Sequence, residues 1–268
     1  MTRRHLAFAC KGAQLIGTLD LPERAEAGST GLLVVSGGNE VRAGAWNGQA
    51  LLAARIAASG FPVFRYDRRG VGDSEGENSG FRRSGPDIAA ALAAFRGEVP
   101  GLTRVIAFGN CDAAAALMLT GGWGCDGLVL ANPWTFEDAG DGDASAEQAA
   151  PAPDSLRAHY RQRLRDPAAL LRLLRGGVAL GPLLRSLVGA ARRAPESSLA
   201  GELKAGLAGF AGPVAILLAG RDRTAQTFLA RWDRADPRLR HCPTASHSFV
   251  EPEARDWLAE RLFEALGR

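Results

Sequence analysis

Cys111, Asp222 and His247 have the types and the chain order needed for covalent catalysis. Cys111 stands at the apex of the run Gly109-Asn-Cys-Asp-Ala113, between an apolar strand pattern and an alanine-rich helix pattern. Small residues two positions before and after the apex let a strand and a helix pack closely around a tight turn. A thiol at the start of a helix has its thiolate stabilised by the helix dipole and by unpaired amides. The pattern predicts a nucleophile at Cys111, with a buried inert cysteine as the alternative.

An acid and a base follow the cysteine in the order that a nucleophile–acid–base triad requires. Asp222 comes shortly after the apolar run at 213–219, and His247 lies in a loop before the last helix pattern. We expect His247 to take the thiol proton and later to protonate the leaving group, while Asp222 fixes the ring tautomer and stabilises the imidazolium. Alone, Asp222 could be a helix cap or a turn residue, and His247 an ordinary loop histidine. Their joint order favours catalysis.

Adjacent glycines after an earlier strand pattern are candidates for binding the negative charge that develops in such a reaction. They occur in Ser36-Gly-Gly-Asn39, where the chain can approach a ligand closely because glycine has no side chain. We expect the backbone amide of Gly38 or Asn39, together with that of Asp112, to form an oxyanion hole. A plain glycine turn is the alternative.

The elements that must position these residues alternate along the chain. Strands alternating with helices predict an α/β fold with a mostly parallel central sheet flanked by helices. The first pattern alternates apolar and polar residues, which predicts an edge strand in a hairpin. Strand patterns lie at 14–20, 31–36, 62–66, 104–108, 127–131, 213–219 and near 239, and helix patterns at 45–59, 87–95, 112–119 and 253–266.

An arginine-rich helical segment interrupts this alternation after the sixth strand. We therefore expect a single domain over 1–268, with its core at about 1–135 and 210–268 and a helical lid at about 136–209. Trp134 and Phe136 open the insertion and are expected to line a substrate pocket, or else to pack in the core. The lid helices, with Arg172 and Arg175, could dock an acyl chain and an anionic head group, although solvated arginines are the simpler interpretation.

Composition narrows the class of protein. The chain has 268 residues, 46% hydrophobic and 23% charged with a net charge of +3, which indicates a globular protein and not a collagen-like, coiled-coil or disordered one. The start lacks the apolar core of a signal peptide and no apolar run reaches the ~18 residues of a membrane span, so we expect a cytoplasmic location without firm membrane anchoring. The four cysteines lack paired or zinc-ligand spacing, and we expect no disulfide framework, metal or cofactor. The expected partner is a small-molecule acyl substrate and not nucleic acid, and the oligomeric state stays open.

Several runs are similar to those of a known superfamily. Arg65-Tyr-Asp-Arg-Arg-Gly-Val-Gly-Asp-Ser74 resembles the loop after the fourth strand of the α/β-hydrolases. Three segments resemble the exosortase A system-associated hydrolases of the first type, and these segments are 36–44, 108–113 and 130–136. The resemblance implies the α/β-hydrolase fold and an association with exopolysaccharide export and PEP-CTERM protein sorting. The chain departs from the superfamily pattern in having Ser36-Gly37 instead of His-Gly, and Cys111 instead of serine.

Together these patterns predict an enzyme that cleaves or transfers an acyl group of an ester or thioester through Cys111, His247 and Asp222. A cysteine nucleophile forms a thioester acyl-enzyme, which suits hydrolysis and transfer alike. Two alternatives stay open: an ordinary carboxylesterase acting on small esters, and a non-catalytic binding module on the same fold. Glu137 or Asp138 is the substitute for Asp222 as the acid.

Overall fold

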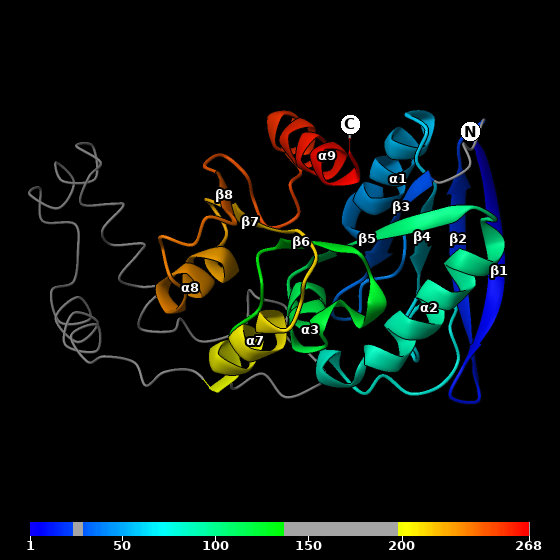
Figure 1. Ribbon diagram of the computed structural model, residues 1–268, viewed down its shortest axis with the longest axis horizontal. Helices are drawn as coiled ribbons and strands as arrows, with labels where there is room; N and C mark the ends of the chain where they lie inside the picture. Colours follow the sequence, from blue (N-terminus) through cyan, green and yellow to red (C-terminus); the bar gives the residue numbers. More distant parts are fainter. Residues whose placement is uncertain (24–28, 137–197, 268) are drawn as a thin grey trace, which may run out of the picture.

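The strands form one mixed sheet in the computed structural model, which describes residues 1–23, 29–136 and 198–267 (Figure 1). Within these ranges the sheet has eight strands in the order β1-β2-β4-β3-β5-β6-β7-β8. β1 and β2 form an antiparallel hairpin, β2 pairs antiparallel with β4, and all remaining pairs are parallel. The strands span Thr2–Cys10 (β1), Ala13–Leu21 (β2), Ser29–Val35 (β3), Val63–Tyr66 (β4), Leu102–Asn110 (β5), Gly127–Ala131 (β6), Val214–Ala219 (β7) and Leu239–Cys242 (β8).

Helices cover both faces of this sheet (Figure 1). α1 and α9 lie on one face, and α2, α3, α7 and α8 lie on the other. The helices span Gly48–Ala58 (α1), Gly85–Glu98 (α2), Asp112–Leu119 (α3), Ser198–Ala208 (α7), Arg223–Arg231 (α8) and Pro252–Leu266 (α9), and three short 3₁₀ helices span Ala45–Asn47 (η1), Phe81–Arg83 (η2) and Gly121–Gly124 (η3).

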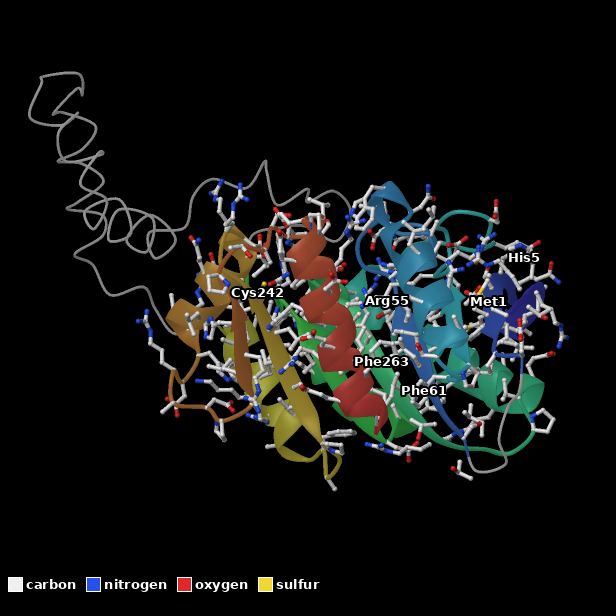
Figure 2. The ribbon with its side chains drawn as sticks, turned by 90° about the horizontal axis from the view of Figure 1, so that it is seen from above. Met1, His5, Arg55, Phe61, Cys242 and Phe263 are labelled. Atoms are coloured by element: carbon white, nitrogen blue, oxygen red, sulfur yellow. The ribbon has the colours of Figure 1, made fainter. Side chains whose placement is uncertain are left out.

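The central strands are apolar without alternation because both of their faces are buried. On β5, Val105 and Ala107 pack against the α2 and α3 layer, whereas Ile106 and Phe108 pack against α1 and α9. Figure 2 looks onto the α1 and α9 face, where the ring centroids of Phe61 and Phe263 lie 6.3 Å apart. This two-sided burial explains why the sequence pattern located the parallel strands.

The predicted fold class is confirmed: the chain has a mostly parallel sheet flanked by helices. The prediction of an edge strand at 14–20 is wrong, because β2 lies between β4 and a further strand, β1. Lys11 and Gly12 join the two strands in a tight turn with φ of 51° and 83°, which suits a two-residue hairpin. β1 escaped the sequence analysis because its first four residues are exposed and alanines dilute the alternation of Leu6 and Phe8.

Part of the predicted lid insertion, about 136–209, packs on the core. Leu199, Leu203 and Leu207 of α7 are buried in the same apolar cluster as α3. Residues 137–197, including Arg172 and Arg175, lie outside the described residues, as do the substitute acids Glu137 and Asp138. In the parts of the chain that the structure describes, no helix is long and apolar enough to cross a membrane.

Candidate active site

Cys111 lies at a sharp turn between β5 and α3. Cys111 is the only residue between the strand and the helix, and it redirects the chain with φ 62° and ψ −124°. Backbone hydrogen bonds hold it there, since its N–H donates to Ala131 O at 2.9 Å and its carbonyl accepts from Trp134 N and Ala115 N, both at 3.2 Å. A non-glycine residue in this conformation costs free energy and persists only where surrounding structure fixes it. The predicted turn is therefore present, with the cysteine at its apex.

The two small residues flanking the turn are required by packing. A Cβ atom on Gly109 would lie 2.8 Å from the carbonyl carbon of Ala113 and 2.9 Å from its oxygen. Ala113 itself is fully buried. Strand and helix backbones thus approach closely enough here to exclude any side chain on Gly109.

Asp222 and His247 lie together beyond the carboxyl ends of β7 and β8. Asp222 caps α8, because its carboxylate accepts from Thr224 N at 3.2 Å and from Ala225 N at 3.1 Å. The same carboxylate places Oδ2 3.0 Å from Nδ1 of His247. The two interpretations of Asp222 are therefore compatible: the cap bonds orient the carboxylate toward the ring.

Burial and the neighbouring polar groups shift the pKa of His247 in opposite directions. Burial disfavours the charged ring, but the hydrogen bonds to Asp222 and Cys111 outweigh it and raise the pKa of His247 to about 10. Burial also raises the pKa of the Cys111 thiol, while the hydrogen bond to His247 acts in the opposite direction. The ring therefore holds its second proton more tightly than an ordinary histidine, and a rise in pH favours the neutral form that can act as a base.

Two asparagines that the sequence analysis did not assign hold the histidine loop in place. Asn110 ends β5 and Asn132 follows β6, and each donates through Nδ2 to the carbonyl of His247 at 3.2 Å. Asn132 Nδ2 also donates to Asn110 Oδ1 at 3.0 Å, and its Oδ1 accepts from Ala219 N at 2.8 Å. One buried side chain thus connects β5, β6, β7 and the histidine loop. In the sequence, these asparagines could have been found as polar residues at the ends of two neighbouring buried strands.

The predicted oxyanion amide of Gly38 already has a partner. Its N–H donates to both carboxylate oxygens of Asp112, at 2.8 and 2.7 Å. Arg68, which is buried, donates to the Gly38 carbonyl and lies 3.8 Å from Asp112 Oδ2. The neighbouring side chain of Asn39 accepts from Asn78 Nδ2 at 2.9 Å. A carboxylate therefore occupies the donor that was assigned to a developing oxyanion.

Trp134 and Phe136 pack on each other beside the turn. Their ring centroids are 4.5 Å apart, and the indole N–H of Trp134 donates to the Phe136 carbonyl at 3.1 Å. Trp134 is buried within the core cluster on the α3 side of the sheet, and Phe136 packs against that cluster. This contact matches the alternative of core packing.

Sequence comparison decides the family. The model of the alpha/beta hydrolase family matches residues 32–261. The chain belongs to the alpha/beta hydrolase family. The match runs from β3 into α9, so it spans Cys111, Asp222 and His247. No curated protein matches the chain significantly.

Solved structures with this hydrolase fold cover nearly the whole chain at low sequence identity. An esterase from Pyrococcus furiosus shares 14% identity over 99% of this chain and 90% of its own, with a TM-score of 0.60. Est1E from Butyrivibrio proteoclasticus, solved with ferulic acid, shares 14% identity over 98% of this chain and 100% of its own, also with a TM-score of 0.60. The hydrolase GrgF from a Penicillium species shares 15% identity over 99% of this chain and 98% of its own, with a TM-score of 0.63. At these identities the likeness concerns the fold alone.

Adding a methyl group at Gly109 tests the packing of the turn. We expect Gly109→Ala to lower the free energy of unfolding by about 1–3 kcal/mol, because the new Cβ collides with the Ala113 backbone. Gly97→Ala is the matched control: Gly97 is helical, and an added methyl group would meet no heavy atom within 4 Å, so this change should raise stability by up to about 1 kcal/mol. Equal effects in urea unfolding would contradict the close approach of β5 and α3.

Removing the charge of Asp222 tests the protonation of the histidine. In Asp222→Asn, burial remains but the charged partner is lost, so the pKa of His247 should fall from about 10 toward its ordinary value. An NMR titration of the ring proton of His247 measures this. Asp233→Asn removes an exposed aspartate after α8 and should leave the midpoint near 10. A His247 midpoint that is the same in all three proteins would show that Asp222 does not control the charge.

Proposed function

We propose that this hydrolase-family protein cleaves or transfers an acyl group, from an ester or a thioester, through a cysteine nucleophile. The observation that carries the proposal is the contact series from Cys111 through His247 to Asp222 at the strand–helix turn. A strained cysteine beside a histidine that is paired with a buried carboxylate has the parts of an activated nucleophile. An inert core cysteine would need none of these contacts, which weighs against a binding module.

The proposed reaction begins with transfer of the acyl group to sulfur. Sγ of Cys111 attacks the carbonyl carbon while its proton passes to Nε2 of His247, whose positive charge Asp222 stabilises. The carbonyl electron pair moves to oxygen, and we assign this oxyanion to the amides of Gly38 and Asp112, with Asn39 as the second loop donor. The tetrahedral species then expels an alkoxide or thiolate, which takes the proton from His247 and leaves a thioester on Cys111.

The second step restores the thiol. Water gives a proton to His247 as its oxygen attacks the thioester carbon, and the carboxylic acid leaves as the sulfur is reprotonated. An alcohol or thiol acceptor in place of water gives transfer by the same proton route. In both steps His247 must begin as the neutral base, so its raised pKa implies rates that increase toward alkaline pH.

Three loop segments support the finer proposal that the chain is an exosortase A system-associated hydrolase of the first type. Segments 36–44, 108–113 and 130–136 carry that resemblance in the sequence. They contribute Gly38, Cys111 and Asn132 to one edge of the sheet. We propose the association with exopolysaccharide export on this basis.

Intact-mass spectrometry after exposure to p-nitrophenyl and acyl-thioester probes tests the nucleophile. We expect one acyl adduct on the unmodified chain and on Cys242→Ala, a control at a buried cysteine, and no adduct on Cys111→Ala. His247→Ala should slow adduct formation by about 10²-fold or more, because the thiol loses its base. Absence of an adduct on the folded chain, or an adduct that persists in Cys111→Ala, would exclude the proposed mechanism.

The Asp112 carboxylate competes with a substrate oxyanion for the Gly38 amide, which gives a second test. Asp112→Ala leaves the backbone amide of residue 112 in place and frees that of Gly38. We expect acylation of Cys111 to accelerate about tenfold, which is less than the about 10²–10³-fold that one oxyanion donor contributes.

Asp112→Asn is the comparison variant, because it loses the charge but keeps a carbonyl oxygen that accepts from Gly38. Its acylation rate, followed by release of p-nitrophenol, should lie between those of the parent and Asp112→Ala. Slower acylation in both variants would mean that the carboxylate assists the reaction, and the oxyanion assignment to Gly38 would fail.

A further inference from the structure

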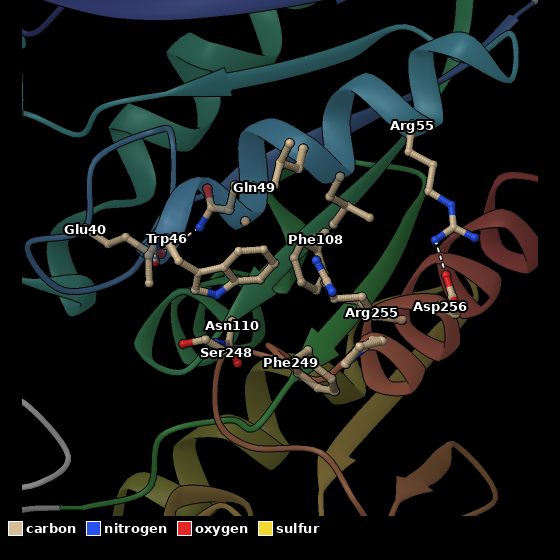
Figure 3. A pocket seen from close by; sticks show the side chains of 16 residues that line it. Glu40, Trp46, Gln49, Arg55, Phe108, Asn110, Ser248, Phe249, Arg255 and Asp256 are labelled. Carbon is tan, nitrogen blue, oxygen red and sulfur yellow. Dashed lines mark hydrogen bonds and ion pairs between the residues drawn. The ribbon is translucent and has the colours of Figure 1, made fainter.

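A cavity of about 360 Å³ lies between α1 and α9, within the size range of small-molecule sites (Figure 3). Most of its wall is apolar, with one wall from α1, one from α9 and a floor from β5. Figure 3 shows the indole of Trp46 extending over the cavity toward Phe108. The apolar lining comprises Trp46, Leu51, Leu52, Phe108, Phe249 and Leu258.

One end of the cavity borders the proposed catalytic residues. Asn110 and Ser248 line it, and they are the chain neighbours of Cys111 and His247. Asn110 also donates to the carbonyl of His247 at 3.2 Å. This end of the cavity therefore adjoins the two chain segments that carry Cys111 and His247, and it lies on the side of the sheet opposite to Trp134.

The charged side chains of the cavity are already engaged. Glu40 accepts from Ala45 N at 2.7 Å and from Gln49 Nε2 at 2.6 Å. At the far end Arg55 pairs with Asp256 at 2.5 Å, as the dashed line in Figure 3 marks. The Arg255 guanidinium lies 5.4 Å from the centroid of the Trp46 ring. Such a lining favours an uncharged apolar ligand over an ionic one.

Exposed apolar side chains occur in the cavity lining and next to it in the chain. Trp46 and Leu51 line the cavity and are 39% and 56% exposed, while Val41 and Val250, beside the lining residues Glu40 and Phe249 in the chain, are 42% and 43% exposed. Four of the six large exposed hydrophobic side chains among the described residues thus occur in or next to this lining. Clustered exposure of this kind marks a surface that contacts an apolar partner.

We propose that this cavity binds the apolar chain of the acyl substrate, so that the substrate class is a linear aliphatic ester or thioester of medium chain length. The inference rests on the proposed function, because the carbonyl of the bound substrate must reach the thiol of Cys111. It also gives the substrate chain another place than the sequence analysis did: the chain lies in the cavity between α1 and α9, and not against the rings of Trp134 and Phe136.

A binding experiment isolates the cavity from the chemistry. Methyl octanoate, an uncharged ester of medium chain length, is titrated into Cys111→Ala, in which no acylation occurs, and its displacement of the uncharged fluorescent probe N-phenyl-1-naphthylamine gives its Kd. Adding Trp46→Ala should raise the Kd at least tenfold, because the indole covers the cavity. Adding Trp123→Ala should leave the Kd unchanged: Trp123 has a similar exposure of 42% and a similar φ of 46° against 49°, but lies in η3.

A chain-length series links the cavity to turnover. For p-nitrophenyl esters from acetate to octanoate, kcat/KM of the parent should rise about threefold per added methylene. Leu52→Trp, which fills the cavity, should reduce the ratio of kcat/KM for octanoate to kcat/KM for acetate at least tenfold. Trp46→Ala should reduce this ratio by a similar factor, and Trp123→Ala should leave it unchanged. Leu6→Trp, at a similarly half-buried leucine on β1, is the control for the bulk of the new ring.

The outcomes separate the two proposals. Trp46-dependent binding together with a chain-length preference supports both. Acylation of Cys111 with no binding, or with equal losses in the Trp46 and Trp123 variants, overturns the cavity assignment and leaves the proposed function standing. Trp46-dependent binding without any acylation of Cys111 overturns the proposed function and leaves an aliphatic-chain site between α1 and α9.

Discussion

The direct entry of β5 into α3 is the constraint on which the site depends. Because Cys111 is the only residue between them, it must redirect the chain by itself, and it does so with a positive φ. The same geometry brings the strand and helix so close that Gly109 tolerates no side chain. Hydrogen bonds from the end of β6 and from Trp134 hold the turn. The free energy of the buried core, not the turn itself, maintains the strained residue.

The remaining groups depend on a shared edge of the sheet. Parallel strands end at the same side, so residues following β5, β6, β7 and β8 meet although they are distant in the chain. Asn132 lies at this edge and forms hydrogen bonds with Asn110 Oδ1, the His247 carbonyl and Ala219 N. Asp222 uses helix-cap bonds to aim its carboxylate at the imidazole. Both are positioning interactions that fix side chains before any ligand arrives.

Much of this arrangement could be predicted from the sequence, because buried parallel strands leave continuous apolar runs whose ends mark the site. The bounds of α3 and β6 were predicted to the residue, and the order of Cys111, Asp222 and His247 required no structure. Side-chain pairing was beyond prediction, since nothing in the run Ser36-Gly-Gly-Asn39 indicates that Asp112 would bond to Gly38. The cavity was missed for a similar reason, because its wall joins residues from four separate segments.

The two faces of β5 contact different parts of the structure. Val105 and Ala107 of β5 support α3 and hold the turn rigid, whereas Phe108 faces the cavity under α1 and α9. Asn110 ends the strand and contacts the cavity and the histidine loop at once. A chain bound in the cavity would therefore contact the strand that leads into Cys111 and lie beside Asn110, which bonds to the histidine loop. Among the described residues, the proposed chemistry requires one side chain to move. Asp112 must leave the Gly38 amide so that an oxyanion can take its place.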